Sequence, residues 1–567
     1  MKKKAILTLL LALALLLTAC GGEISREAAM SLLGGGTGTG TGRDDIVPYE
    51  QMEYVRPSVE PLKAQADKTS ALLDRGGDLD AILDGLIACN AAYFTFYTMS
   101  TLAELHSCAD QTDASWAAEY DFCDSASVEV EQILDQLYVD CANSDRAEEL
   151  EQEYFGDGFL DYYGADYTGY ADETYASLMQ QETDLLREYR QLRAGLEDEG
   201  GAGSDETPEL AELDPEDEMS YYNAYTNRYG DIYIRLVRVR NELARYCGYE
   251  SYGDYAFDII YGRDYTLDEA EGLAADIRTE IAPLYEELTE QGAWGDYLPG
   301  TVSESEVRST LAAAAADMGG DIAETWDFLD ENHLYDIAVS DKKVNTSFQT
   351  YLEDYEAPYA FVKTDGSDMD LLTFAHEFGH CVDSYYNYND TNSLELAETF
   401  SQGMEYLLLG ELSGEMQRSL TGQKLMDTVD TYAQQGSFFA FEQQVYSLPD
   451  EELTVEKIND ISLQVAKDYG YYTEGYDDYY AKSWIDITHF FEYPYYVISY
   501  CVSNDAAFQL YEREQAEQGS GLAVYNDLLP RDHDGFLETI TEQGGLESPF
   551  APGRMASTAA VIRAALG

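Results

Sequence analysis

Residues 371–380 read Leu-Leu-Thr-Phe-Ala-His376-Glu377-Phe-Gly-His380, and this stretch decides the fold and the site that we expect. Two histidines four residues apart lie one above the other on one face of a helix. From there both imidazoles can reach one Zn²⁺ ion at the usual ~2.0–2.1 Å. Glu377 stands between them, placed to act on a water molecule rather than to bind the metal. The alternative is a helix with two structural histidines and a solvated glutamate.

A catalytic zinc site needs a third protein ligand beside the two histidines and keeps one position open. The next predicted helix, over residues 394–409, carries Glu395, Glu398 and Glu405. Glu398 and Glu405 are seven residues apart, two helical turns, so they share a face. One of them can bind the metal while the other hydrogen-bonds a ligand histidine and fixes its tautomer. Spacing alone does not choose among the three acids.

The two helices together resemble the oligoendopeptidase F and thimet oligopeptidase family of zinc metallopeptidases. That family has an Ala-His-Glu-x-Gly-His motif, followed by a helix whose Glu stands three residues before a Ser, as in Ala397-Glu398-Thr-Phe-Ser401. The resemblance implies that His376, His380 and Glu398 bind one Zn²⁺ per chain. It also implies a mainly α fold, with a two-lobed helical body around a deep substrate channel and a small β-sheet beside the zinc helix.

The resemblance also assigns roles to Glu377 and Glu405, and it extends upstream of the motif. It implies that Glu377 is the catalytic base and that Glu405 supports a ligand histidine. Residues 357–366 are similar to the edge strand before the family's zinc helix, which pairs with the peptide substrate. This similarity implies a substrate strand at Ala360, Phe361, Val362 and Lys363. Farther upstream, residues 246–265 resemble a segment that opens the family's second half.

A His/Tyr segment, residues 489–500, resembles another part of the same family. A tetrahedral intermediate needs a hydrogen-bond donor for its oxyanion, and His N–H or Tyr O–H groups are suitable. Tyr496 and Tyr500 are four residues apart and share a helical face. The resemblance implies that His489 with Tyr500 or Tyr496 stabilises the intermediate or binds substrate. The alternative is that these residues are core aromatics, and Tyr493, Tyr495 and Tyr496 cannot be ranked from the sequence.

The first twenty residues predict an export signal. Three lysines precede an apolar run over residues 5–17, and Leu17-Thr-Ala-Cys20 resembles the site at which bacterial lipoproteins are cleaved and acylated. We expect a lipidated Cys20 that anchors the chain to the outer face of a bacterial cell membrane, outside the cytoplasm. The alternative is an ordinary secretory signal. The expected divisions are a signal peptide (1–19), a lipid anchor and Gly/Thr tether (20–50), an N-terminal helical lobe (51–205), a zinc peptidase region (206–555) and a C-terminal tail (556–567).

The charge of the chain limits its partners. There are 33 Lys+Arg and 109 Asp+Glu among 567 residues, a formal net charge of −76. Nucleic-acid binding is excluded, because phosphate neutralisation needs surplus cations. The sequence therefore predicts a monomeric zinc-dependent oligoendopeptidase for short or unfolded peptides, cationic ones among them. The rival hypotheses are a catalytically degenerate peptide-binding lipoprotein and a structural helical surface protein.

Overall fold

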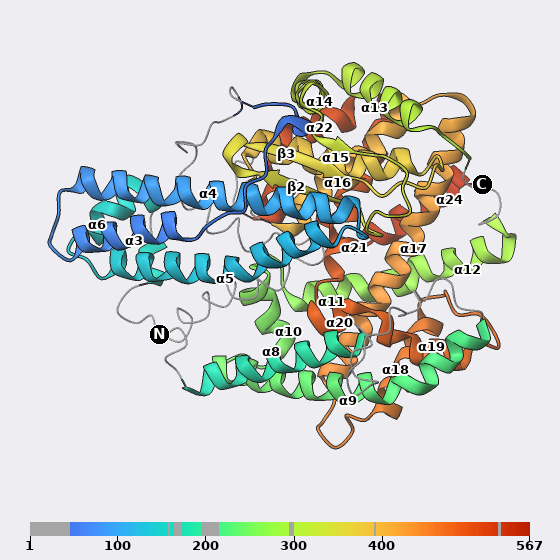
Figure 1. Ribbon diagram of the computed structural model, residues 1–567. Coiled ribbons are helices and arrows are strands. Elements are labelled where there is room, and N and C mark those ends of the chain that lie inside the picture. Colours follow the sequence, from blue (N-terminus) through green and yellow to red (C-terminus); the bar gives the residue numbers. More distant parts are fainter. Residues whose placement is uncertain are drawn as a thin grey trace.

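Figure 1 shows the computed structural model of the chain, which describes residue 43 and residues 46–156, 159–163, 173–193, 215–293, 300–389, 393–530 and 535–566. Over these residues the chain is mostly helical with one small sheet, which confirms the predicted fold class. The predicted signal peptide, Cys20 and most of the tether lie outside the described residues.

The helices follow one another with mostly short connections. Their bounds are α3 (Glu60–Leu73), α4 (Leu79–Ala109), α5 (Ala114–Ala142), α6 (Ala147–Leu150), α7 (Phe159–Tyr162), α8 (Glu173–Arg193), α9 (Pro215–Cys247), α10 (Tyr252–Tyr255), α11 (Leu267–Asp276), α12 (Ala282–Gln291), α13 (Glu304–Met318), α14 (Gly320–Asn332), α15 (Asp370–Asn387), α16 (Leu394–Glu411), α17 (Gly414–Tyr446), α18 (Val455–Asp468), α19 (Asp477–Lys482), α20 (Thr488–Glu492), α21 (Ile498–Ala516), α22 (Ser520–Leu528), α23 (Phe536–Glu538) and α24 (Arg554–Leu566).

Two separate hydrophobic cores hold these helices. The smaller core lies among α3, α4 and α5, which project to one side in Figure 1. The larger core contains the sheet, α15, α16, α17 and α21, and it also takes in α8 and the end of α4. Helix α8, which the sequence prediction placed in the N-terminal lobe, therefore packs with the larger core. By length and composition α4 could cross a membrane, but in the structure it packs against α3 and α5.

The sheet has three strands in the order β1–β3–β2, and it corrects one prediction. β3 (Ala357–Phe361) pairs in parallel with β1 (Tyr335–Asp336) and antiparallel with β2 (Phe348–Leu352). Of the segment predicted as an edge strand for substrate, Ala360 and Phe361 thus lie in the central strand, and Val362 and Lys363 directly follow it. Ala360 N and Val362 N donate to carbonyls of the β1 side, and Lys363 N donates to Ser347 Oγ. The expected edge position is wrong, because Ala360 and Phe361 pair with β1 on one side and β2 on the other, which leaves β1 and β2 as the outer strands.

The C-terminal residues are a packed helix rather than the tail expected from residue 556. In α24, Met555, Ala559 and Ile562 are buried in the larger core. Arg554 at its start lies 2.8 Å from Asp505 of α21 and 2.8 Å from Glu512. Because its apolar residues pack into the larger core, α24 belongs to the same folded body as α15, α16 and α21.

Candidate active site

Helices α15 and α16 lie unusually close together where the site forms. α15 buries Phe374, Phe378 and Cys381 among its apolar residues, and α16 begins after Ser393, whose hydroxyl accepts from Leu396 N. A Cβ atom at Gly379 would come within 2.5 Å of Phe400 O and 2.6 Å of Ser401 Cα. Only glycine therefore allows the backbones to approach so closely at this point.

This close approach brings the three predicted metal ligands together. Glu398 Oε2 lies 3.5 Å from His376 Nε2 and 3.8 Å from His380 Nε2. One donor atom from each residue lies within 4.8 Å of the other two. The side chains of His376, His380 and Glu398 are 28%, 18% and 13% exposed, so the cluster can be reached from outside. Ser401 Oγ donates to Glu398 Oε2 at 2.9 Å and orients that carboxylate.

A chain of buried charges lies behind His376. Its Nδ1 is 2.9 Å from Glu405 Oε1, as the sequence predicted for a supporting acid, and this leaves Nε2 to face Glu398. Glu405 Oε2 is 2.8 Å from Nζ of Lys424 in α17, and Lys424 is only 3% exposed. Lys424 is a residue that sequence reasoning missed, because its contact with Glu405 depends on how α17 packs against α16.

Burial and charge set the protonation of the two histidines and of Glu377. Burial alone would lower the pKa of His376, but the bond to Glu405 and the nearby carboxylates raise it to about 9. This position thus favours positive charge. Burial lowers the pKa of His380 to about 4, so its imidazole is neutral. Glu377 is 5% exposed, and burial is the main cause that raises its pKa to about 7.

The His/Tyr segment forms one aromatic cluster. The ring centroid of His489 lies 5.4 Å from that of Tyr496 and 6.0 Å from that of Tyr500. The hydroxyls of Tyr496 and Tyr500 are hydrogen-bonded, and burial together with the neighbouring Tyr500 and Glu398 raises the pKa of Tyr496. The cluster therefore lies within electrostatic reach of Glu398 in α16. Burial lowers the pKa of His489 to about 4, which leaves a neutral ring with one N–H to donate.

Two of the alternatives that the sequence left open point elsewhere. Tyr495 is 1% exposed, and its hydroxyl donates to Gln443 Oε1 at 2.9 Å, so it is a core residue. Glu395 does not face the histidines. Its carboxylate accepts from Arg263 Nε at 3.0 Å and from Tyr265 OH at 2.6 Å.

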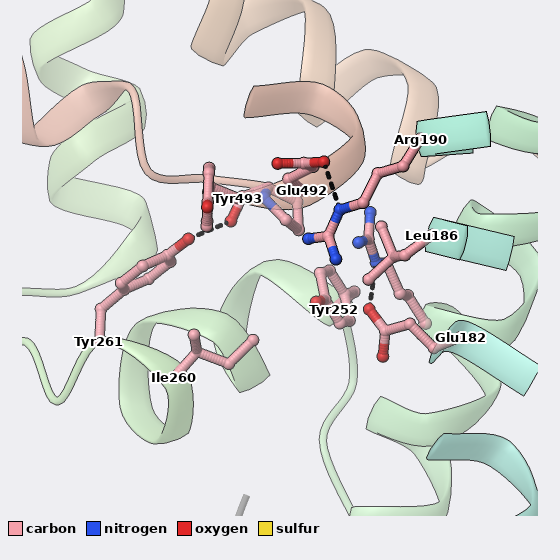
Figure 2. A pocket seen from close by; sticks show the side chains of 10 residues that line it. Glu182, Leu186, Arg190, Tyr252, Ile260, Tyr261, Glu492 and Tyr493 are labelled. Atoms are coloured by element: carbon pink, nitrogen blue, oxygen red, sulfur yellow. Dashed lines mark hydrogen bonds and ion pairs between the residues drawn. The ribbon is translucent and has the colours of Figure 1, made fainter. Parts of the chain in front are cut away.

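A small cavity lies behind the turn that carries Tyr493 (Figure 2). Two ion pairs line it: Arg190 Nε to Glu492 Oε1 at 2.9 Å, and Arg240 Nε to Glu182 Oε1 at 2.6 Å. Tyr261 OH donates to Pro494 O at 2.9 Å on the opposite wall. The charged groups of this cavity bind one another. The contacts of Glu492 and Pro494 hold the turn that carries Tyr493 in place.

An HExxH helix packed on a second helix that supplies a glutamate is the donor arrangement of the His₂Glu metallopeptidases. Two family descriptions match the sequence: "Peptidase M3 N-terminal domain" over residues 49–163 and "Peptidase family M3" over residues 316–531. The second match contains all three clustered ligands. The chain belongs to peptidase family M3, which confirms the resemblance to oligoendopeptidase F.

Individual relatives agree with this assignment. The chain is 26% identical to oligopeptidase PepF of Bacillus subtilis over 261 residues, which cover 43% of this chain and 38% of the relative. It is 26% identical over 170 residues to an oligoendopeptidase F homolog of Borreliella burgdorferi, covering 27% of this chain and 28% of that protein. These matches span less than half of each relative. The solved structure of PZ peptidase A with inhibitor 2 shares the fold, with a TM-score of 0.72, 20% identity, and coverage of 91% of this chain and 98% of the other.

Proposed function

We propose that this chain is a zinc-dependent oligoendopeptidase that hydrolyses short or unfolded peptides. The observation that carries the proposal is the cluster of His376, His380 and Glu398 with Glu377 on the same helix. Membership of a peptidase family supports hydrolysis as the reaction class. The intact Glu377 argues against the rival hypothesis of a binding protein without turnover.

The donor set fits zinc. Two imidazole nitrogens and one carboxylate oxygen are the ligands of a catalytic zinc site that keeps an open position. The carboxylates that raise the pKa of His376 also favour a cation at this point. When bound, zinc would polarise the scissile carbonyl and acidify a water molecule.

The protein's own residues supply proton transfer and hydrogen bonds. Glu377 takes the proton of the attacking water and passes it to the leaving amine, and a pKa raised to about 7 suits both steps. A neutral His489 and the hydroxyl of Tyr500 or Tyr496 would donate to the carbonyl oxygen as negative charge develops on it. An extended peptide that joined the sheet would pair with an outer strand, β1 or β2.

The location and the substrates are also proposals. The predicted leader and Cys20 support a chain that is lipid-anchored outside the cytoplasm, on the outer face of a bacterial cell membrane. The net charge of −76 supports cationic oligopeptides as substrates and argues against nucleic acid as a partner. We expect a monomer.

Hydrolysis of an internally quenched peptide tests the proposed function. The purified chain should contain about one zinc ion, cleave the peptide, lose activity with a chelator and regain it with Zn²⁺. Glu377→Gln should lower kcat by about 10³-fold or more with zinc still bound, because it removes the base and leaves the ligands. Full activity of that variant, or peptide binding without cleavage by the zinc-loaded wild type, would contradict the proposal.

A further inference from the structure

Arg263 is a fully buried cation placed between the two parts of the candidate active site. Its side chain is 0% exposed and that of its partner Glu395 is 4% exposed. Arg263 follows the π-helical turn Ala256–Ile260 by three residues and belongs to no helix or strand itself. A buried guanidinium is costly unless its hydrogen bonds are satisfied, so its partners indicate what it holds.

At one end Arg263 holds the metal-ligand helix. Its Nε donates to Glu395 Oε1 at 3.0 Å, and Glu395 lies one helical turn before Glu398 in α16. Tyr265 OH and Ser499 Oγ donate to the same carboxylate oxygen, at 2.6 Å and 2.7 Å. Ser393 Oγ donates to the other oxygen at 2.9 Å. The carboxylate of Glu395 is therefore fixed from several sides.

At the other end Arg263 holds the turn that carries the tyrosines. Its Nη2 donates to Tyr495 O at 3.0 Å and to Ser499 Oγ at 2.7 Å. Tyr495 has φ +66°, a left-handed conformation that a tyrosine rarely adopts and that needs support from its surroundings. Glu442 supplies further support, because its two oxygens accept from Tyr495 N at 3.0 and 3.1 Å. Tyr496 and Tyr500 directly follow these two held positions.

We propose that Arg263 and Glu395 are positioning residues that set the distance between Glu398 and the His489–Tyr496–Tyr500 cluster. One planar guanidinium bridges both elements, so it transmits the position of the metal-ligand helix to the groups that face the developing oxyanion. The inference rests on the proposed function. It assigns Arg263 to the stabilisation of the transition state, and neither to metal binding nor to the affinity for an uncleaved peptide.

Arg263→Met in the full zinc-loaded chain is the direct test. We expect kcat to fall by about 10²-fold, the effect of misplacing a catalytic group by about 1 Å. KM and the zinc dissociation constant, measured by chelator competition, should change by less than about threefold. The affinity for a phosphinic peptide, whose tetrahedral phosphorus imitates the transition state, should fall together with kcat. Arg263→Lys should resemble Arg263→Met, because an ammonium cannot span both partners.

Milder variants and a matched control protect the test against simple unfolding. Ser499→Ala removes a hydroxyl that bonds both Arg263 and Glu395, and it should lower kcat about 3–10-fold in a folded protein. Arg554→Met breaks another buried ion pair, with Asp505, at the C-terminal helix. It should lower the melting temperature but leave the kcat of the folded protein and the phosphinic peptide affinity unchanged.

The outcomes separate this inference from the proposed function. A zinc-loaded wild type without hydrolysis would end the proposed function and this inference with it. An active wild type with Arg263→Met and Ser499→Ala equally active would overturn the inference alone. Loss of zinc affinity in step with kcat would also overturn it, since Arg263 would then support the metal site. A fall in kcat and in phosphinic peptide affinity with unchanged zinc binding would support it.

Discussion

Glu442 shows how much a single buried residue can determine at this site. It is 0% exposed and lies in α17, where its carboxylate accepts the Tyr495 N–H. Burial raises the pKa of Glu442 from 4.5 to about 8, although the charges of Arg240 and Arg263 act in the opposite direction. The proton of this carboxyl is thus bound in the folded chain at pH values at which an unfolded chain has released it.

Glu442 should therefore make stability depend on pH. Because its pKa is raised in the folded state, the folded chain binds more protons between pH 4.5 and about 8, and stability falls as pH rises through that window. The maximum slope from one group is ~1.4 kcal/mol per pH unit. Glu442→Gln keeps a hydrogen-bond acceptor but cannot ionise. Its melting temperature should rise relative to wild type as pH goes from 5 to 8, and parallel curves for the two proteins would refute this prediction.

At the scale of elements, the site depends on how closely α15 and α16 approach. The histidines come from one helix and Glu398 from the other, so the distance between the helices fixes the size of the proposed metal site. Gly379 permits this distance, because a Cβ there would collide with the backbone of Phe400 and Ser401. A Cβ at a second glycine of α16, Gly403, would come within 2.9 Å of Leu510 Cδ1 in α21, which is a contact with a side chain rather than with backbone.

Gly379→Ala should separate the two helices. We expect zinc affinity to fall by at least about tenfold and stability to decrease, because overpacking a close helix contact costs ~1–3 kcal/mol. Zinc competition and thermal unfolding measure the two effects. Gly272→Ala in α11 is the control, because its Cβ would have no neighbour within 4 Å, and it should leave zinc affinity unchanged. Wild-type zinc affinity in folded Gly379→Ala would show that the close approach is not needed.

The sequence predicted local features better than contacts between distant segments. The four-residue spacing of the histidines and the seven-residue spacing of Glu398 and Glu405 are local patterns, and they place His376, His380 and Glu398 on helices that the structure contains. Whether a strand lies at an edge or in the centre of a sheet depends on partners elsewhere in the chain. The predicted edge position of β3 was wrong for this reason. Arg263 and Lys424 were missed for the same reason, since the carboxylates that they contact at this site, Glu395 and Glu405, lie on another element of the fold.

Across the whole protein, some of the few Lys and Arg side chains are buried in ion pairs instead of lying at the surface. Arg240, Lys424 and Arg554 are among the buried residues, each in an ion pair with a carboxylate. Each such pair is neutral, so the net charge of −76 is carried by the remaining groups with even fewer cations among them. Such a molecule attracts positively charged peptides over distances that salt shortens.

Peptides of different charge should therefore respond differently to salt. Between 50 and 500 mM NaCl, kcat/KM for a Lys/Arg-rich peptide should fall by about tenfold, while a neutral peptide of equal length should change by less than about twofold. Steady-state kinetics with both peptides measures the difference. Equal salt dependence would leave the charge with a role in solubility only.

Because α4 contributes residues to both hydrophobic cores, its two parts become buried at different stages of folding. The first part of this helix packs with α3 and α5, its neighbours in the chain, so a chain that emerges from its N-terminus can bury those residues early. Leu102 and Leu105 belong instead to the larger core, and Thr101 Oγ donates to Tyr351 O of β2, about 250 residues later. Until β2 has been synthesised and packs against it, the end of α4 exposes apolar side chains that can aggregate. A nascent chain halted before residue 348 should consequently be a preferred client of a chaperone.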